Sequence, residues 1–248
     1  HGVYSWVPDE VKDRLMELCR RTLRPAGVAY VSYNVMPGWG LLGGLRRVLL
    51  AEVPRNADPE AQAERIQQVL QGLAQGLAAQ PGAYAALARE HILEMRKKPY
   101  DLLLHDELEL INDPRTFLEF NAHAERHGLH YLAEAHFATM PFEHLPVEIR
   151  NALTGLRLGF LRAQQFLDVL CQRWLRNSLL IKNPVSSRTL DFLALRDAAF
   201  GLRLRAEENT VNVAAGETVR FLGRPPLAFT FEEPMHKAIL AVLAEAAP

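Results

Sequence analysis

The chain has 248 residues, with 28 Lys and Arg against 29 Asp and Glu, and 49% of its residues are hydrophobic. This balance excludes a disordered or fibrous chain, and a net charge of −1 argues against a general nucleic-acid-binding protein. No apolar run reaches the roughly 20 residues of a membrane span, and no signal-peptide pattern opens the chain. Cys19 and Cys171 lie in amphipathic helical patterns. We therefore expect reduced core thiols in a cytoplasmic protein.

Residues 1–52 are predicted to be the end of an α/β fold. The chain opens without methionine on apolar and aromatic residues, which we interpret as a cut near the end of a buried strand in a longer protein. A helix is expected from Pro8, followed by a strand over 28–33 whose apolar run fits a parallel sheet. Residues 34–40 are expected to form a loop at the carboxyl end of this strand, where open α/β sheets bind ligands. A helix over 41–51 completes this remnant of a doubly wound sheet.

Residues 53–184 are predicted to form an all-helical bundle. Pro, Asn, Asp and Arg gather between 53 and 59, which indicates a domain boundary. Apolar residues then recur at helical spacing. They predict helices over 58–80, 83–97, 100–111 and 114–127, and two more helices between 147 and 182, with 129–137 ambiguous.

Residues 185–248 are predicted to form a small α+β module. Apolar and polar residues alternate near 202–206, 219–221 and 227–231, with glycine and proline turns between them. This period of two indicates a small antiparallel sheet, and Pro234 starts a last helix. The predicted fold class is therefore mainly α with a small β component.

Three histidines, His123, His127 and His130, follow the spacing H-x3-H-x2-H. The first two are one helical turn apart, as in a zinc-binding pair. However, the segment lacks the H-E-x-x-H order, and Gly128 is expected to end the helix before His130. We therefore expect no metal site, and interpret these histidines as solvated or helix-capping.

No local catalytic motif stands out. On a helix over 100–111, His105 and Glu109 would face each other, which favours a helix-stabilising pair over an acid–base pair. The chain has no G-x-S-x-G, P-loop or glycine-rich dinucleotide motif. Gly40, Gly43 and Gly44 follow the predicted strand but lack the spacing of a nucleotide-binding turn.

Aromatic residues gather around the predicted strand end: Tyr4, Trp6, Tyr33 and Trp39, together with Asn34. Beside the carboxyl edge of a sheet, this set would suit a flat or amine-bearing substrate. Ordinary packing of the core explains the same residues equally well. Both interpretations stay open.

The segments HGVYSWVP (1–8), PAGVAYVSYN (25–34) and PGW (37–39) resemble bacterial class I S-adenosylmethionine-dependent methyltransferases. In particular, the chain resembles the subgroup with a methyltransferase regulatory domain, related to bacterial protein-lysine methyltransferases. The regulatory pattern appears in YDLLLHDEL (100–108), GLHYLAEA (128–135) and QFLD (165–168). The resemblance implies regulatory-motif candidates at His105, Glu109, Asn112, Tyr131, Glu134, Gln165 and Arg173.

The resemblance also sets expectations for cofactor and catalysis. S-adenosylmethionine is implied for the full-length protein, but the glycine-rich cofactor motif and the acidic ribose-binding residue are absent here. Ile181 and Lys182 stand where a Cys-His pair is expected, and His136 where an acidic residue is usual. We therefore expect no cofactor and no catalytic residue in this fragment.

The residue patterns and the family resemblance support three alternative hypotheses for the function of the chain. The first is a non-catalytic regulatory or substrate-presenting region of a methyltransferase, with the missing N-terminal half and a protein substrate as partners. The second is a shortened complete protein-lysine methyltransferase whose residues 1–40 line the methyl-acceptor pocket. The third is a scaffold that oligomerises through the bundle or through the exposed edge of strand 28–33. No nucleic acid or membrane span is expected.

Overall fold

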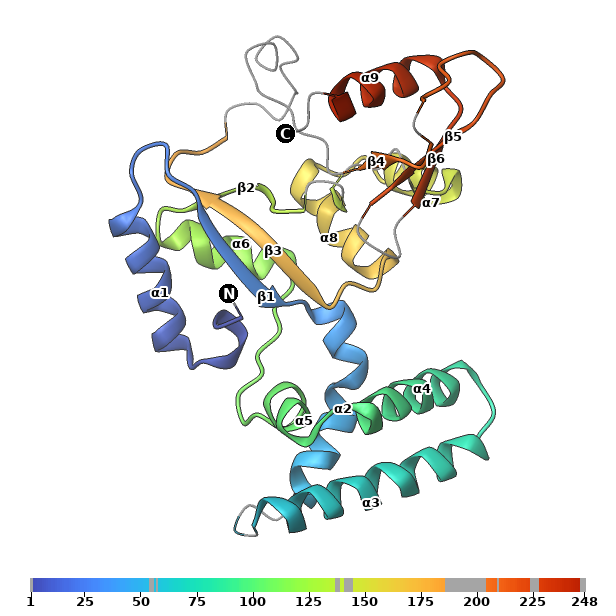
Figure 1. Ribbon diagram of the computed structural model, residues 1–248. Coiled ribbons are helices and arrows are strands. Elements are labelled where there is room, and N and C mark those ends of the chain that lie inside the picture. The colour runs from blue at the N-terminus through green and yellow to red at the C-terminus, as the bar shows by residue number, and fades with distance from the viewer. Residues whose placement is uncertain are drawn as a thin grey trace. The chain divides into compact units, whose positions relative to one another are not determined.

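The computed structural model describes residues 2–53, 56, 58–136, 139–140, 145–185, 204–208, 210–223 and 228–245. The chain divides into two compact units, a first unit of His1–Ser186 and a second unit of Ser187–Pro248 (Figure 1). Each unit is described by itself. Among the described helices, none combines the length and apolar character that crossing a bilayer requires.

The first unit is built on a three-stranded sheet in the order β1-β3-β2. The strands are β1 (Ala29–Asn34), β2 (His130–Glu134) and β3 (Leu175–Ile181), and β3 lies between the other two (Figure 1). Both pairings are antiparallel, with Tyr30 opposite Leu179 and Tyr131 opposite Leu180. The sequence predicts a parallel sheet for residues 28–33, and this prediction is wrong for the pairing of β1 with β3, which is antiparallel. Residues near β1 cannot indicate this polarity, because the partner strand lies almost 150 residues later in the chain.

Helices α1 (Asp9–Thr22) and α6 (Phe117–Arg126) pack with the sheet and with the short 3-10 helix η1 (Tyr4–Trp6). Tyr33 of β1 stacks on Phe120 of α6 with ring centroids 3.8 Å apart. A capping box starts α6, because the Thr116 hydroxyl accepts from the Glu119 amide while the Glu119 carboxylate accepts from the Thr116 amide. The core of this part consists of Tyr4, Met16, Tyr33, Val35, Phe117, Phe120, Leu129, Tyr131 and Leu180, with smaller neighbours.

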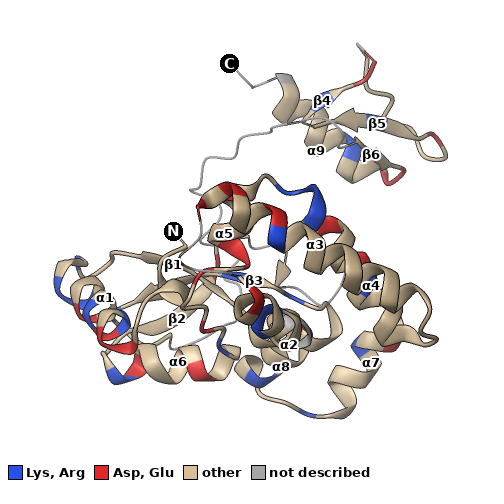
Figure 2. Ribbon diagram, turned by 90° about the horizontal axis from the view of Figure 1, so that it is seen from below, with Lys and Arg blue, Asp and Glu red and all other residues tan. Residues whose placement is uncertain are grey.

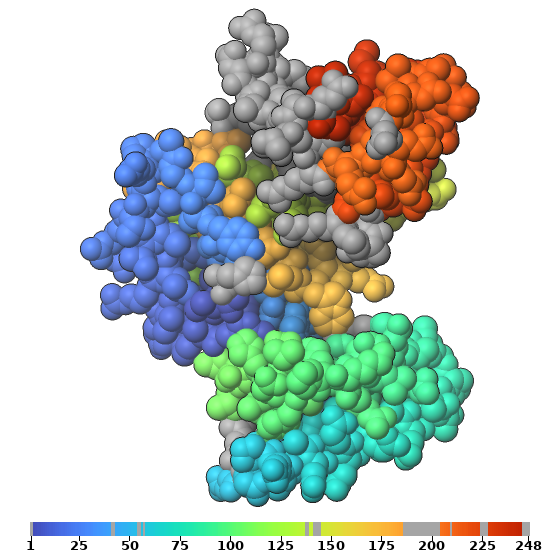
Figure 3. Space-filling model, in the orientation of Figure 1, coloured from blue at the N-terminus to red at the C-terminus, as the bar shows by residue number. Residues whose placement is uncertain are grey.

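A second hydrophobic cluster joins α2 (Met36–Glu52), α3 (Pro59–Ala78), α4 (Ala83–Lys97) and α5 (Tyr100–Asp106). Asp58 caps α3 by accepting from the amides of Glu60 and Ala61. The buried members are Leu49, Ile66, Leu70, Ala74, Ile92, Met95, Leu103 and Leu108. Figure 3 shows the cyan-to-green surface of these helices meeting the blue and gold surface of the sheet part.

Three element predictions for the first unit are wrong. The expected loop over 34–40 is largely helical, because α2 begins at Met36 with a proline in its first turn. The helix expected over 100–111 ends at Asp106. Residues 175–181 form strand β3 rather than helix, so the region 53–184 is not all-helical. Helices α7 (Val147–Gly155) and α8 (Phe160–Leu170) agree with the expected interruption near Gly155 and Gly159.

The second unit contains a small antiparallel sheet, as its alternating sequence predicts. Its strands are β4 (Arg205–Ala206), β5 (Val219–Leu222) and β6 (Ala228–Phe231), in that order, followed by α9 (Pro234–Glu245). The parts of the alternating pattern at residues 202, 203 and 227 lie outside the described residues. The fold class is confirmed as mainly helical with small antiparallel sheets. Of the two cysteines, Cys19 is half-buried, whereas Cys171 is exposed at the end of α8 and is not a core thiol.

Candidate functional site

A cavity of about 790 Å³ opens in the first unit where the sheet part meets the helices α2, α4 and α5. This volume is typical of a pocket for a small molecule or a large side chain. Its walls come from η1, the end of β1, three helices and the segment before β3. Principal lining residues are Trp6, Asn34, Trp39, Glu90, His91, Glu94, Lys98, His105, Asp106, Glu107 and Trp174.

Five aromatic rings follow one another along this pocket. Trp39 contacts Trp6 on one side and Trp174 on the other, edge to face, with centroid distances of 6.0 and 5.8 Å. The ring of His105 lies 5.8 Å from Trp6, and His91 stacks on Trp174 at 5.6 Å. The chain has three tryptophans in all, so every tryptophan lines this pocket.

The close approach of α2 to the segment before β3 brings Trp39 and Trp174 together. The amides of Val35 and Gly38 donate to the carbonyls of Trp174 and Arg173, at 2.9 and 3.0 Å. A Cβ on Gly38 would lie 2.5 Å from the Arg173 carbonyl oxygen and 2.8 Å from the Trp174 ring. Only glycine therefore fits at this position without moving the backbone.

Asn34 ends β1 at the pocket wall and is held on three sides. Its side-chain amide donates to Oδ1 of Asn112 at 2.9 Å, and its backbone amide donates to the Ser5 hydroxyl at 2.8 Å. Its carbonyl accepts from the Arg115 amide at 3.0 Å. Two predicted site residues from different motifs, Asn34 and Asn112, thus support each other directly.

The pocket carries more negative than positive charge. Four carboxylates line it, from Glu90, Glu94, Asp106 and Glu107, against the one ammonium of Lys98. Lys98 is already engaged, because Nζ lies 3.1 Å from both Asp106 and Glu107. Burial lowers the pKa of Lys98, but these two carboxylates outweigh it and raise the pKa overall. Figure 2 colours the acidic positions red, including those on α5.

His91 is the second titratable ring of the pocket. Its Nε2 lies 4.0 Å from Glu107, and most of its side chain is covered. Burial lowers its pKa, the charge of Lys98 lowers it further, and the charges of Glu107 and Glu94 oppose this effect only in part. The neutral imidazole is therefore the favoured form near neutral pH.

The structure separates the five predicted substrate-pocket residues into two groups. Trp6, Asn34 and Trp39 line the pocket. Tyr4 and Tyr33 instead lie in the core with 2% and 1% exposure, and Tyr4 forms a 2.6 Å hydrogen bond to Nδ1 of His123. Of the two interpretations of these aromatic residues, core packing therefore applies to Tyr4 and Tyr33.

Three regulatory-motif candidates join one buried ionic network around Arg176. The guanidinium of Arg176 contacts Asp168 and, at 2.7 Å, Glu134. Glu134 also accepts from the hydroxyls of Tyr131 and Ser178 and from the Asn177 amide. Arg173 contacts Asp168 at 3.3 Å. This network ties α8 to β2 and β3, which is a structural role.

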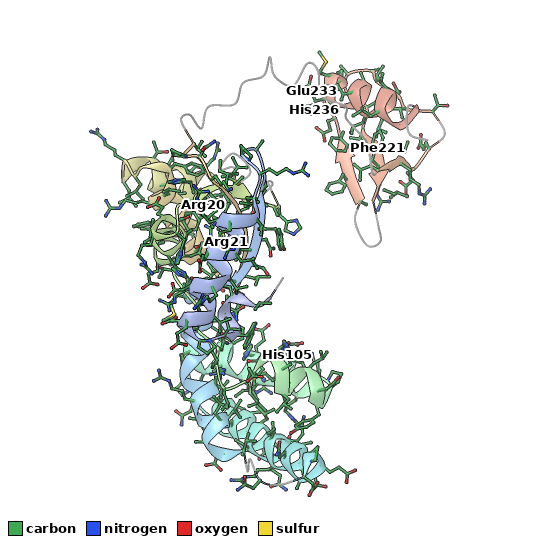
Figure 4. All side chains as sticks on the ribbon, turned by 90° about the vertical axis from the view of Figure 1, so that its left-hand side faces the viewer. Arg20, Arg21, His105, Phe221, Glu233 and His236 are labelled. Atoms are coloured by element: carbon green, nitrogen blue, oxygen red, sulfur yellow. The ribbon has the colours of Figure 1, made fainter. Side chains whose placement is uncertain are left out.

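The other motif candidates are dispersed. His105 extends from α5 at the pocket wall (Figure 4), with its Nδ1 3.3 Å from Asp106. Glu109 lies beyond the end of α5 and accepts from the Leu110 amide, so the expected helical pair with His105 is not formed among the described contacts. Gln165 accepts a hydrogen bond from the Leu118 amide at 3.0 Å.

The sequence reasoning missed the pocket residues contributed by α4. Glu90, Glu94 and Lys98 follow one another at intervals of four residues, which places charged groups on one helix face. This four-residue spacing is a signal in the sequence from which a charged face of α4 can be predicted. Asp13 was missed as well: its carboxylate and the imidazoles of His123 and His127 form a group whose ligand atoms lie within 4.8 Å of one another.

Comparisons with known proteins agree with this architecture. Residues 99–182 match the family described as predicted methyltransferase regulatory domain. The chain is 30% identical over 185 residues to the protein RP789 of Rickettsia prowazekii, covering 75% of this chain and 33% of RP789. It is also similar to the structure of PKMT2 from Rickettsia typhi in complex with AdoHcy, with 27% identity and a TM-score of 0.77. That match covers 99% of this chain and 48% of PKMT2. The chain thus spans about a third to a half of these relatives.

Proposed function

We propose that this chain, which carries a methyltransferase regulatory domain and is similar to PKMT2, is the substrate-presenting region of an S-adenosylmethionine-dependent protein methyltransferase. In this proposal the 790 Å³ pocket receives a lysine side chain of the protein substrate. The observation that carries it is the combination of three tryptophans with an excess of carboxylates in one pocket.

The chemistry of lysine matches both features of the pocket. Its ammonium is attracted to the faces of tryptophan rings and to carboxylates, while its four-carbon stem packs on apolar surface. Trp6, Trp39 and Trp174 offer the aromatic surface. Lys98 neutralises part of the charge of Asp106 and Glu107, and Lys97 pairs with Glu94 at 2.5 Å. Among the described contacts, Glu90 is the pocket carboxylate without an ion pair.

The glycines after β1 do not form the glycine-rich turn that holds a nucleotide-type cofactor. The three glycines that follow β1, Gly40, Gly43 and Gly44, lie inside helix α2 and not in a strand-to-helix turn. They therefore cannot let the backbone approach a nucleotide as a glycine-rich turn does. We propose that another part of the methyltransferase binds the cofactor and that this chain by itself transfers no methyl group. Calorimetric titration with S-adenosylmethionine tests this point, since micromolar binding would contradict it.

The open edge of β1 is the proposed contact with the rest of the methyltransferase. Among the described strands, β1 pairs with β3 alone. At the end of its other edge the backbone of Asn34 already bonds to Ser5 and Arg115, so the proposed further strand pairs with the residues before Asn34. The N-terminal part of a relative such as PKMT2, added in trans, should form a 1:1 complex. A concentration-dependent mass of this chain by itself would instead favour the oligomeric scaffold.

Tryptophan fluorescence tests the pocket directly, because all three tryptophans line it. Titration with a peptide carrying one central lysine should give a saturable change. The same peptide with acetyl-lysine should bind about 10-fold more weakly, a difference of roughly 1.4 kcal/mol.

Charge-removal variants complete this experiment. The double substitution Glu90→Gln and Glu94→Gln should weaken the lysine peptide but not the acetylated one. Glu64→Gln on α3 is the control, because Glu64 is exposed and outside the pocket. Equal affinity for both peptides, or no effect of the double substitution, would contradict the proposal.

A further inference from the structure

Two histidines, His123 of α6 and His127 at the C-terminal cap of the same helix, meet a carboxylate of α1 at the surface of the first unit. Nε2 of His123 and Nε2 of His127 lie 2.8 and 3.0 Å from the same oxygen, Oδ1 of Asp13. The two imidazoles are one helical turn apart, and Asp13 arrives from a helix 110 residues earlier in the chain. We infer that Asp13, His123 and His127 form a binding site for a divalent transition-metal ion, with zinc as the best-matched ion.

The donor atoms have the composition of such a site, and both nitrogens lie near the carboxylate oxygen at close to the required spacing. Zinc takes imidazole nitrogen and carboxylate oxygen at about 2.0–2.2 Å in tetrahedral geometry, which places neighbouring ligand atoms roughly 3.3 Å apart. The present separations of 2.8 and 3.0 Å need to widen by only a few tenths of an ångström. All three donor atoms lie within 4.8 Å of one another.

His123 also has a hydrogen-bond partner on its other ring nitrogen, as zinc-binding histidines usually do. Its other ring nitrogen, Nδ1, lies 2.6 Å from the hydroxyl of Tyr4, which is buried in the core. When Nε2 binds a metal, Nδ1 carries the ring proton and donates it to the Tyr4 oxygen, which fixes the tautomer and the ring orientation.

The exposures of the three residues leave room for a fourth ligand. The side chain of His123 is 9% exposed, that of His127 is 23% and that of Asp13 is 56%. A metal would therefore be anchored on its inner side by the protein and would face solvent on its outer side, where a water molecule can complete the tetrahedron. By joining α1 to α6, it would also stabilise this part of the fold.

Zinc titration of the untagged, chelator-treated chain tests the inference. Calorimetry should give one site per chain with a dissociation constant in the micromolar range or below. Cobalt(II), used as a second probe, should give the visible absorption bands of a tetrahedral site. Zinc should raise the melting temperature of the chain by a few degrees.

Single substitutions identify the ligands. Asp13→Asn and His127→Asn should each weaken zinc binding at least 10-fold, and Tyr4→Phe should weaken it by about 10-fold because the hydroxyl that orients the His123 ring is lost. His130→Asn is the control, because His130 lies on β2 outside the group. Circular dichroism confirms that each variant is folded. Zinc binding that survives both Asp13→Asn and His127→Asn, or no binding at all, would overturn the inference.

Discussion

Arg176 binds Asp168 through Nε, which lies 3.0 Å from both carboxylate oxygens, in the interior of the first unit. Both side chains have no measurable exposure, and the guanidinium also lies 3.9 Å from the ring of Phe117. The pair joins α8 to the central strand β3. Glu134 binds the same guanidinium, so Arg176 serves two buried carboxylates, while Arg173 adds a second cation at Asp168.

Removing this cation should strongly destabilise the first unit. Arg176→Leu leaves Glu134 buried without its cation and leaves Asp168 with Arg173 alone, so we expect a loss of about 3–5 kcal/mol in the free energy of unfolding. Urea denaturation followed by circular dichroism measures the loss. Arg162→Leu on the exposed face of α8 is the control and should cost at most about 0.5 kcal/mol. Similar midpoints for the two variants would contradict the assigned role of the network.

The glycines of α2 should respond to alanine in opposite directions. Gly38→Ala brings a Cβ against Arg173 and Trp174 and should cost about 1–3 kcal/mol. Gly44→Ala meets no atom within 4 Å in the same helix, so its higher helix propensity should stabilise the chain by up to about 1 kcal/mol. The melting temperatures of the Gly38→Ala and Gly44→Ala variants test these two expected changes in stability. If Gly38→Ala were also stabilising, the close approach of α2 to the segment before β3 would be disproved.

The stability of the first unit should fall as the pH drops below about 6.5, the ordinary pKa of histidine. Burial and the charge of Lys98 lower the pKa of His91 in the folded chain. In this window the unfolded chain binds more protons than the folded chain, so the free energy of unfolding rises with pH. The stabilising contribution of neutral His91 is complete above its pKa in the unfolded chain. It is lost as the pH falls from that value toward the lower pKa in the folded chain. His91→Asn should reduce the slope between about pH 7 and pH 5, measured by urea midpoints. Burial lowers the pKa of His123 too, so part of the slope should remain.

Lys237 should be the most sensitive charged residue of the described second unit. Its side chain is buried, and its ammonium donates to the carbonyls of Ala214 and Glu217 at 2.5 and 2.7 Å. Lys237→Met leaves both carbonyls without this donor, which should cost about 2–3 kcal/mol and speed proteolysis near residues 214–217. Arg220→Met, which breaks only the exposed pair with Glu207, should cost less than about 1 kcal/mol. Equal proteolysis of the two variants would contradict this prediction.

Helices and strands whose boundaries are set by nearby capping and turn residues could be predicted from the sequence alone. Helix α3 follows from the Asp58 cap, a proline in the first turn and an apolar stripe. Helix α9 and the strands β5 and β6 follow equally from proline, glycine turns and alternation. In each case the residues that decide the conformation are within a few positions of one another.

Strand β3 could not be predicted in this way. Its centre contains Arg176, Asn177 and Ser178, which do not form an apolar strand pattern. These residues fit there because Asp168 and Glu134 provide buried partners from α8 and β2. The early end of α5 is likewise a consequence of tertiary packing, since Leu103 and Leu108 are both buried in the helical cluster.

The sequence by itself determined the family resemblance, the helical character and part of the candidate pocket, namely Trp6, Asn34 and Trp39. Only the tertiary structure decided which distant residues meet: Trp39 with Trp174, and Asp13 with His123. The physical reason is that such pairs are separated by more than 100 residues, so their contact depends on the packing of the whole core. Periodicity and capping report on neighbours along the chain, whereas a pocket or a metal site is formed by neighbours in space.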